Sequence, residues 1–437
     1  MVSSGQNQSQ LFPLLLVNFI GTLGFSIVLP FLVFLVKDFG GNAIVFGILS
    51  ATYPAFQLIG APILGRWSDI YGRKRILLLS NGGTLVGWIF FLFALFLPVE
   101  NLFSVNSTSF GTFVMTLPLL VLFIARSIDG ITGGNISVAN AYLADISSEE
   151  NRSSNFGKMA ISSNLGFIAG PALAGILGAT VYKEILPVIA ALLLSLSTLI
   201  VIGLVLKESK PPSAAIVVQE KGTIRKVFAQ ECKECYETID PKKLRFRDIF
   251  NLKHISFLLL LYFCIFLGFN IFYASFPIHA VVTLKWSVTQ LGIFYAVLSG
   301  MMILVEGPLL RKALKKFSEE ILVIIGCIIL DTDFILLISN NILLVYGAAV
   351  MFAVGNGLMW PSFLSILSKR AGTVHQGAVQ GAAGSVGSLA SIIGLTVGGL
   401  LYSLLGGITF LISAGVIFAV FIMSLRLLKN RNSIKVV

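Results

Sequence analysis

Two ionisable side chains lie within one long apolar segment of the sequence. Arg126 and Asp129 are three residues apart in a stretch dominated by Leu, Ile, Phe and Val. Residues at this spacing share one face of a helix, where Arg and Asp can form a salt bridge. A charge at the centre of a membrane helix costs about 2.5–3.5 kcal/mol on insertion scales, so such charges are usually paired and functional. Asp129 is therefore a candidate proton carrier whose protonation would free Arg126. A static brace between helices is the alternative.

A short basic loop carries the second group of candidate residues. The run Gly65–Arg75, with the sequence Gly-Arg-Trp-Ser-Asp-Ile-Tyr-Gly-Arg-Lys-Arg, lies between two apolar runs long enough to cross a membrane. Gly65 and Gly72 permit the positive φ that a sharp turn between two helices needs. Asp69 can accept backbone N–H groups at a helix N-terminus, where the helix dipole favours a negative charge. We therefore expect a tight turn whose acid can bind a helix end.

The composition that surrounds these residues is that of a membrane protein. Of the 437 residues, 56% are hydrophobic and only 12% are charged, and the mean hydropathy is +0.92. Apolar runs of about 18 residues or more predict membrane-spanning helices, because about 20 residues cross a hydrocarbon core of roughly 30 Å. Helices also satisfy their own backbone groups in lipid. We predict an all-α membrane protein with twelve transmembrane helices, at about 12–36, 44–64, 76–97, 112–142, 156–179, 185–206, 255–282, 289–310, 321–339, 342–367, 377–402 and 408–428.

The basic residues are distributed unequally between the two sides of the membrane. Of the 31 Lys and Arg, all but four fall on the side of the Gly65–Arg75 loop; Lys37, Lys183 and Lys285 fall on the other side, and Arg126 lies within a span. Cytoplasmic loops carry the excess of Lys and Arg, so both termini are predicted to be cytoplasmic. The net charge of +11 thus reports membrane topology, and no nucleic-acid partner is expected.

The spans divide into two repeated halves. We expect an N-terminal six-helix bundle at 1–206, a cytoplasmic linker at 207–254 and a C-terminal six-helix bundle at 255–437. Three glycines of the first half recur 224 residues later, with Gly157, Gly170 and Gly175 matched by Gly381, Gly394 and Gly399. Such repeats are typical of alternating-access transporters, whose substrate site lies between the halves. Cys232 and Cys235 form a C-x-x-C in the linker without the second pair that a zinc site needs, so no metal or cofactor is expected.

Taken together, these motifs resemble those of the major facilitator superfamily. Gly65–Lys74 is similar to the family's loop between helices 2 and 3, and Arg126–Gly130 to its R-x-x-x-G motif in helix 4. Gly166–Gly175 resembles the G-x-x-x-G-P-x-x-x-G motif of antiporters, in which Gly166, Gly170, Pro171 and Gly175 are the matching residues. The runs Ala144–Arg152 and His375–Gly381 are similar to those of the tetracycline-efflux branch of drug–proton antiporters.

The resemblance implies roles for particular residues. The implied gate consists of Gly65, Asp69, Gly72, Arg73 and Lys74, with Asp69 bound to helix 11 near Gln376 in the outward-facing state. Asp331 and Asp333 lie in helix 9, and Asp331 is taken as a proton-coupling candidate because the tetracycline branch carries an acid at nearly this place. Glu306, near the end of helix 8, is expected to reach toward the membrane interface.

Two departures from that branch concern the substrate. Gly21 in helix 1 and Gly87 in helix 3 stand where the tetracycline branch has acids, which disfavours tetracycline itself. The cavity-lining helices 1, 4, 7 and 10 instead offer the amides and aromatics Asn18, Asn135, Asn140, Asn270, Tyr273, Asn356 and Trp360, and all of these but Asn140 are taken as the substrate-cavity candidates. This largely neutral set suits an amphipathic molecule.

These observations predict a monomeric, multi-pass transporter in the plasma membrane that works by alternating access. Its partners are a small-molecule substrate, protons and the lipid bilayer, and proton-coupled efflux of an amphipathic molecule is the favoured mechanism. Proton-coupled uptake of a sugar, peptide or organic acid is one alternative. A non-transporting receptor or scaffold with the same fold is another. An enzyme is not expected, because no H-E-x-x-H, nucleophile elbow or phosphate loop is present.

Overall fold

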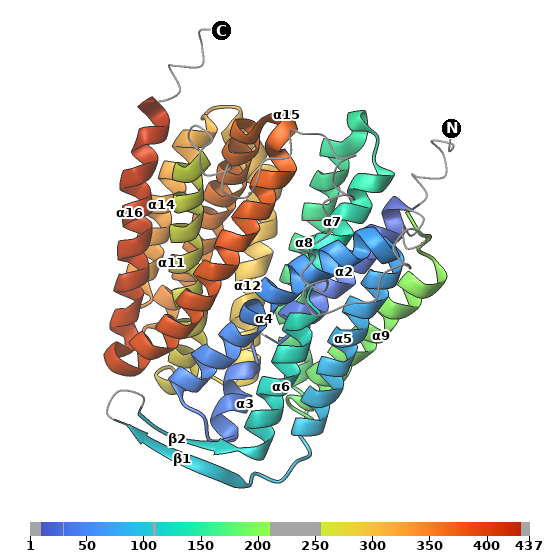
Figure 1. Ribbon diagram of the computed structural model, residues 1–437. Helices are drawn as coiled ribbons and strands as arrows, with labels where there is room; N and C mark the ends of the chain where they lie inside the picture. Colours follow the sequence, from blue (N-terminus) through green and yellow to red (C-terminus); the bar gives the residue numbers. More distant parts are fainter. Residues whose placement is uncertain (1–9, 29, 108–110, 210–254, 430–437) are drawn as a thin grey trace.

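The computed structural model describes residues 10–28, 30–107, 111–209 and 255–429, and it is almost entirely helical (Figure 1). In the N-terminal half the helices are α2 (Leu11–Ser26), α3 (Leu32–Asp38), α4 (Ala43–Tyr71), α5 (Arg73–Ala94), α6 (Leu117–Ile131), α7 (Asn135–Ile146), α8 (Glu149–Gly178) and α9 (Ile185–Leu204). In the C-terminal half they are α11 (Ile255–Val282), α12 (Val288–Leu304), the π-helix η4 (Val305–Leu309), α13 (Leu310–Leu314), α14 (Glu319–Leu336), α15 (Ile342–Leu405), the 3₁₀-helix η5 (Gly406–Ile408) and α16 (Thr409–Lys429). Cys232 and Cys235 lie outside the described residues.

These helices form the twelve expected membrane segments. Helix 1 is interrupted and comprises α2 and α3, helix 4 comprises α6 and α7, and helix 8 comprises α12, η4 and α13. Helix 4 breaks at Thr132–Gly134, where two consecutive glycines separate α6 from α7. Apolar composition alone marks eight helical stretches of the described chain as long enough to cross a membrane.

Helices 10 and 11 both belong to α15, which doubles back on itself. Trp360 and Gly387 lie beside the same side chain, Tyr262 of α11: the Trp360 and Tyr262 ring centroids are 5.3 Å apart, and a Cβ on Gly387 would lie 2.8 Å from Tyr262 Cε1. Twenty-seven residues of straight helix would span about 40 Å. The chain therefore reverses between these residues, and helical backbone continues through the reversal. The reversal lies in the interval that contains Gln376, and the unbroken helix α15 marks no separate start of helix 11 within it.

The predicted boundary of helix 4 is also wrong at its first residues. Residues 112–116 are not helical but belong to β2 (Gly111–Thr116), which pairs antiparallel with β1 (Asn101–Ser107). Thr116 then precedes α6, which has Pro118 in its first turn, a position where proline's missing N–H costs nothing. The hairpin lies at the end of the molecule opposite the start of α2 and the end of α16 (Figure 1).

The glycine repeat corresponds to matching helix contacts in the two halves. Gly170 of α8 packs on α2, where an added Cβ would lie 2.7 Å from the Leu23 carbonyl oxygen. Its counterpart Gly394 of α15 packs on α11, where a Cβ would lie 3.0 Å from the Leu267 carbonyl oxygen. Helix 5 thus lies on helix 1 as helix 11 lies on helix 7. This pseudo-symmetry confirms the two related six-helix bundles.

The second repeated glycine pair joins the halves to each other. A Cβ on Gly175 of α8 would lie 2.7 Å from Gly292 Cα of α12, and a Cβ on Gly399 of α15 would lie 3.0 Å from Gly47 Cα of α4. Small residues permit this close backbone approach between membrane helices. Gly47 lies in the first turns of α4, which follow the α3–α4 connection that bonds to the hairpin. We call these two contacts the outer seal.

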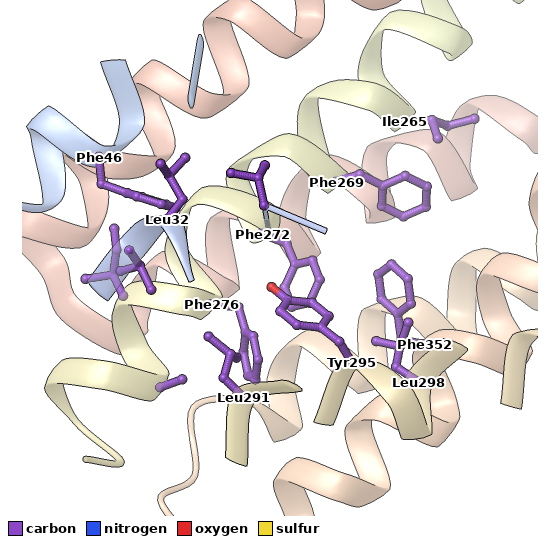
Figure 2. Close-up of a cluster of buried hydrophobic side chains, with 14 of the residues drawn as sticks. Leu32, Phe46, Ile265, Phe269, Phe272, Phe276, Leu291, Tyr295, Leu298 and Phe352 are labelled. Atoms are coloured by element: carbon purple, nitrogen blue, oxygen red, sulfur yellow. The ribbon is translucent and has the colours of Figure 1, made fainter. Parts of the chain in front are cut away.

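The C-terminal half is held together by aromatic packing around α11. Figure 2 shows Phe272 and Phe276 of α11 close to Tyr295 of α12 and Phe352 of α15. The Phe272 and Phe352 ring centroids are 5.1 Å apart. Stacked and tilted ring pairs at such distances add to the stabilisation from apolar burial. This cluster fixes α11, which carries the two predicted cavity residues Asn270 and Tyr273.

Candidate functional site

A cavity of about 600 Å³ lies between the two halves. Its wall is drawn from α2, α4, α5, α6, α7 and α8 on one side and from α11, α12, η4 and α15 on the other. Its lining includes the six substrate-cavity candidates Asn18, Asn135, Asn270, Tyr273, Asn356 and Trp360, but not Asn140, which the sequence also offered. Gly21 also lines it, and a Cβ there would meet only Asn135 Nδ2, at 3.9 Å.

The two sides of the cavity differ in chemistry. The N-terminal half contributes five amide side chains, those of Asn18, Gln57, Asn81, Asn135 and Asn164. The C-terminal half contributes an aromatic group in which Tyr262 stacks on Phe266 with centroids 4.7 Å apart and both meet Trp360 edge-on at 5.3 Å. The N-terminal side is thus richer in amides that can hydrogen-bond a polar group, and the C-terminal side, which adds the amides Asn270 and Asn356, carries the aromatic group that can hold a flat apolar one.

Arg126 reaches this cavity from α6 and is almost fully buried. Its Nη1 lies 3.8 Å from Asp129 Oδ2, which is an ion pair but is too long for a direct hydrogen bond. Its guanidinium lies over the rings of Tyr53 and Phe25, 5.0 and 5.8 Å from their centroids, and Nε has no hydrogen-bond partner. The guanidinium is thus held by aromatic faces while donors remain free for a ligand.

Asp129 points away from the cavity toward α5. An added Cβ on Gly87 would lie 3.2 Å from Asp129 Cβ, so the glycine at this position lets α5 approach the ion pair closely. Asp129 therefore lies at the interface of helices 3 and 4. This placement fits both the carrier and the brace interpretations of the pair.

Tyr53 and Gln57 of α4 belong to the site but escaped the sequence analysis. Gln57 Nε2 donates to the Tyr53 hydroxyl at 3.0 Å and to the Gly133 carbonyl oxygen at 2.9 Å. These bonds tie α4 to the break in helix 4 and fix the ring beneath Arg126. Tyr53 and Gln57 are four residues apart, so the sequence indicates that they share one face of a helix. Nothing in the sequence, however, links this pair to Arg126.

Glu306 does not occupy the place expected for it. It lines the cavity from η4, and its Oε2 accepts a hydrogen bond from Asn164 Nδ2 of α8 at 3.3 Å. The expectation that it reaches the membrane interface is wrong in this structure, because the π-helical turn directs it between the halves. Short π-helical turns are frequent at functional sites.

Asp331 and Asp333 of α14 lie behind the cavity and are absent from the lining found among the described residues. Asp333 is 1% exposed and its Oδ2 has no partner within the described chain, and Asp331 Oδ1 is likewise unpartnered there. The ring of Phe334, the next residue, packs 5.4 Å from Phe272 of α11. The two acids thus lie within the C-terminal bundle, outside the cavity lining.

The loop predicted at Gly65–Arg75 is almost entirely helical, because α4 runs to Tyr71 and α5 begins at Arg73. The turn expected at Gly65 is therefore wrong, and the positive φ is found at Gly72 alone within this fully described segment. The segment is held within the N-terminal half. Arg73 is 5% exposed and bonds to Asp69, to Ser68 Oγ at 2.6 Å and to Asp145 Oδ2 at 3.0 Å. The side chain of Asp69 is 64% exposed. Lys74 Nζ donates to the Gly203 carbonyl oxygen at 2.8 Å. The latch between Asp69 and helix 11 was expected for the outward-facing state, and it stays a prediction.

Glu208 caps the helix that follows this loop. Its Oε1 accepts from the Arg73 backbone N–H at 2.6 Å, and Lys74 N lies 3.2 Å from both carboxylate oxygens. The carboxylate thereby satisfies first-turn donors of α5, where the helix dipole favours it. Gly72 has φ +100°, and a Cβ there would lie 2.5 Å from Glu208 Oε2, so both the turn and the cap require glycine.

The glycines of the helix 5 motif take part in two helix contacts. Gly166 packs on α2, where a Cβ would lie 2.6 Å from the Phe19 carbonyl oxygen, and Gly170 follows one turn later on the same helix. Gly175 belongs to the outer seal, and Pro171 lines the cavity. The motif thus serves a tight helix crossing and one wall of the cavity.

Comparisons with known proteins agree with this architecture. The family model described as Major Facilitator Superfamily matches residues 14–395. The class E tetracycline resistance protein of Escherichia coli is 28% identical over 393 residues, which cover 89% of this chain and 87% of that protein. Multidrug resistance protein 1 of Bacillus subtilis (strain 168) is 26% identical over 398 residues, with 90% and 89% covered.

Solved structures show the same fold. The human organic anion transporter MFSD10 (TETRAN) has a TM-score of 0.64 at 20% identity and covers 96% of this chain and 99% of its own. The D-xylose-proton symporter has a TM-score of 0.69 at 16% identity, with 95% and 97% covered. With the family model matching most of its length, this chain belongs to the Major Facilitator Superfamily.

Proposed function

We propose that this protein exports small amphipathic molecules in exchange for protons, by alternating access of one central cavity. The observation that carries the proposal is the cavity itself, which is built from both halves and is lined by amides, aromatics and Arg126. The export direction is supported by relatives that are tetracycline and multidrug resistance proteins and that match along nearly the full chain.

The structure corresponds, in this proposal, to the inward-facing state. The outer seal brings the halves into backbone contact near the hairpin end, while the cavity lining continues past it to Leu77, Ala139 and Glu306. The exposed Asp69 is then a released latch. The excess of Lys and Arg in the loops supports a cytoplasmic position for the end opposite the hairpin and for both termini. Residues 1–206 and 255–437 act as the two moving bundles of a monomer, joined by the linker 207–254.

Proton coupling is assigned to the pair of Arg126 and Asp129. The carboxylate lies beside a guanidinium to which it is not hydrogen-bonded, so protonation of Asp129 removes the attraction without breaking a tight bidentate bond. Arg126, which faces the cavity, then becomes available to substrate. The pair therefore connects proton binding on one side of α6 with substrate binding on the other.

Transport into proteoliposomes tests this proposal. The full-length protein is reconstituted with a pH-sensitive dye inside, and ethidium or tetracycline is added under a pH gradient of either sign. Proton and probe movement in opposite directions is the expected result. Movement in the same direction would establish the uptake alternative. The absence of movement with these two probes and with a broad set of further amphipathic molecules, under both gradients, would favour a non-transporting role.

A further inference from the structure

Two side chains of opposite charge face the cavity, one from each half. Among the described lining residues, Arg126 of α6 and Glu306 of η4 are the ones that carry formal charge. The remainder of the wall is neutral. The cavity is therefore bipolar across the interface that must open and close.

The basic pole offers unused hydrogen-bonding capacity. Arg126 is 5% exposed, its Nε has no partner in the described chain, and its ion pair with Asp129 spans 3.8 Å without a hydrogen bond. A guanidinium carries five N–H donors and cannot lose its charge. A carboxylate or another acidic group of a ligand would accept hydrogen bonds from the Arg126 guanidinium, to which Asp129 makes no hydrogen bond.

The acidic pole is equally incomplete. Glu306 receives a 3.3 Å hydrogen bond from Asn164, and an ionised carboxylate can accept about four. Asn164 belongs to the N-terminal half, so this bond crosses the interface between the halves. An ammonium group is a stronger donor to a carboxylate than an amide is, and it would replace Asn164.

We propose that the cavity selects zwitterionic amphiphiles. The acidic group of the substrate binds Arg126, its basic group binds Glu306, and its flat apolar body lies against Tyr262, Phe266 and Trp360. The inference rests on the proposed transport function and specifies its substrate class. A molecule bound at both poles bridges the two halves, so it also favours their approach around the cavity.

Three fluorescent probes with one aromatic body and different charge test this selection. Nα-dansyl-lysine is a zwitterion, its methyl ester is a cation and its Nε-acetyl derivative is an anion. Each is titrated into the purified full-length protein in detergent, without any gradient. We expect the zwitterion to bind at least about tenfold more tightly than either singly charged probe, which corresponds to about 1.4 kcal/mol.

Charge-removing variants should produce a crossed pattern. Glu306→Gln should weaken the zwitterion and the ester about tenfold and leave the acetyl derivative unchanged. Arg126→Gln should weaken the zwitterion and the acetyl derivative and leave the ester unchanged. Glu319→Gln is the matched control, because this carboxylate of α14 pairs with Lys369 outside the cavity lining.

Several results would overturn the inference. These are failure of the zwitterion to bind the unmodified protein, equal affinity for the three probes, or an equal loss for all three in Glu306→Gln. Should that variant not remain monodisperse, the ranking of the probes on the unmodified protein and on the charge-conserving Glu306→Asp decides. Because no gradient is involved, a negative binding result is independent of the outcome of the proteoliposome experiment.

Discussion

Replacing Gly292 by alanine should open the outer seal. An alanine methyl group at this position would overlap Gly175 Cα, and the reciprocal distance, from a Cβ on Gly175 to Gly292 Cα, is 2.7 Å. Both contacts involve backbone atoms, so no side chain can rotate away to accommodate the methyl group. The strain is relieved when the two helices separate at the hairpin end.

The size of the effect follows from overpacking energies. Extra methylenes in a packed interface typically cost about 1–3 kcal/mol. Because the cost falls on the sealed state alone, the ratio of outward-facing to inward-facing molecules should rise by about 5- to 150-fold. Gly300, in the same helix, is the matched control: a Cβ there has no neighbour within 4 Å, so Gly300→Ala changes helix propensity without affecting the seal.

Labelling of a buried cysteine measures the opening. Val281 is 4% exposed and lines a small space between the halves at the hairpin end. In a background with the four native cysteines replaced by alanine, Val281→Cys should react slowly with a maleimide. Adding Gly292→Ala should raise the rate by about the factor given above, whereas Gly300→Ala should not. Equal rates in the two glycine variants would refute the assignment of Gly175 and Gly292 to a seal.

Three further variants address the N-terminal half. Asp69→Asn should abolish transport at normal expression, measured in the proteoliposome assay, and unchanged transport would contradict the latch. Asp129→Asn should lose probe movement driven by a pH gradient but retain downhill probe efflux; retention of both would exclude the carrier role and favour the brace. Glu208→Ala should lower the apparent melting temperature of the purified protein, because removal of a helix cap costs roughly 0.5–2 kcal/mol. Glu184→Ala is the control, since Glu184 stands at the N-cap of α9 and makes no side-chain capping bond; equal shifts in the two variants would contradict the capping role.

The sequence predicted what depends on apolar run length and on local motifs. The twelve segments and the repeat of Gly170 and Gly175 followed from these signals, and the six substrate-cavity candidates lie in the cavity lining, whereas Asn140 does not. Cavity residues were predictable because helices 1, 4, 7 and 10 face the interface in this family, and amides on them stand out against apolar neighbours.

What escaped prediction depends on contacts between distant segments. Tyr53 is an ordinary aromatic residue of helix 2 until α6 places Arg126 on its ring. Glu306 was misplaced because a π-helical turn changes the direction of the following side chains, and hydropathy does not report such a turn. Glu208 lies 135 residues from the backbone N–H of Arg73 that it caps. The hairpin was missed for two reasons. The six paired residues of β1 follow a predicted helix, and β2 is apolar enough to be read as the beginning of the next helix.

The β1–β2 hairpin is an accessible attachment point on the N-terminal bundle. Val114 N donates to the Gly40 carbonyl oxygen at 3.0 Å, and Thr116 Oγ1 donates to the Phe39 carbonyl oxygen at 2.7 Å, so the strands are fastened to the connection between α3 and α4. An antibody fragment raised against the exposed face of β1 would move together with the N-terminal bundle. The bound fragment would add mass for single-particle imaging and would not contact the C-terminal bundle. Inward-facing and outward-facing particles could then be sorted by the angle between the fragment and the C-terminal bundle.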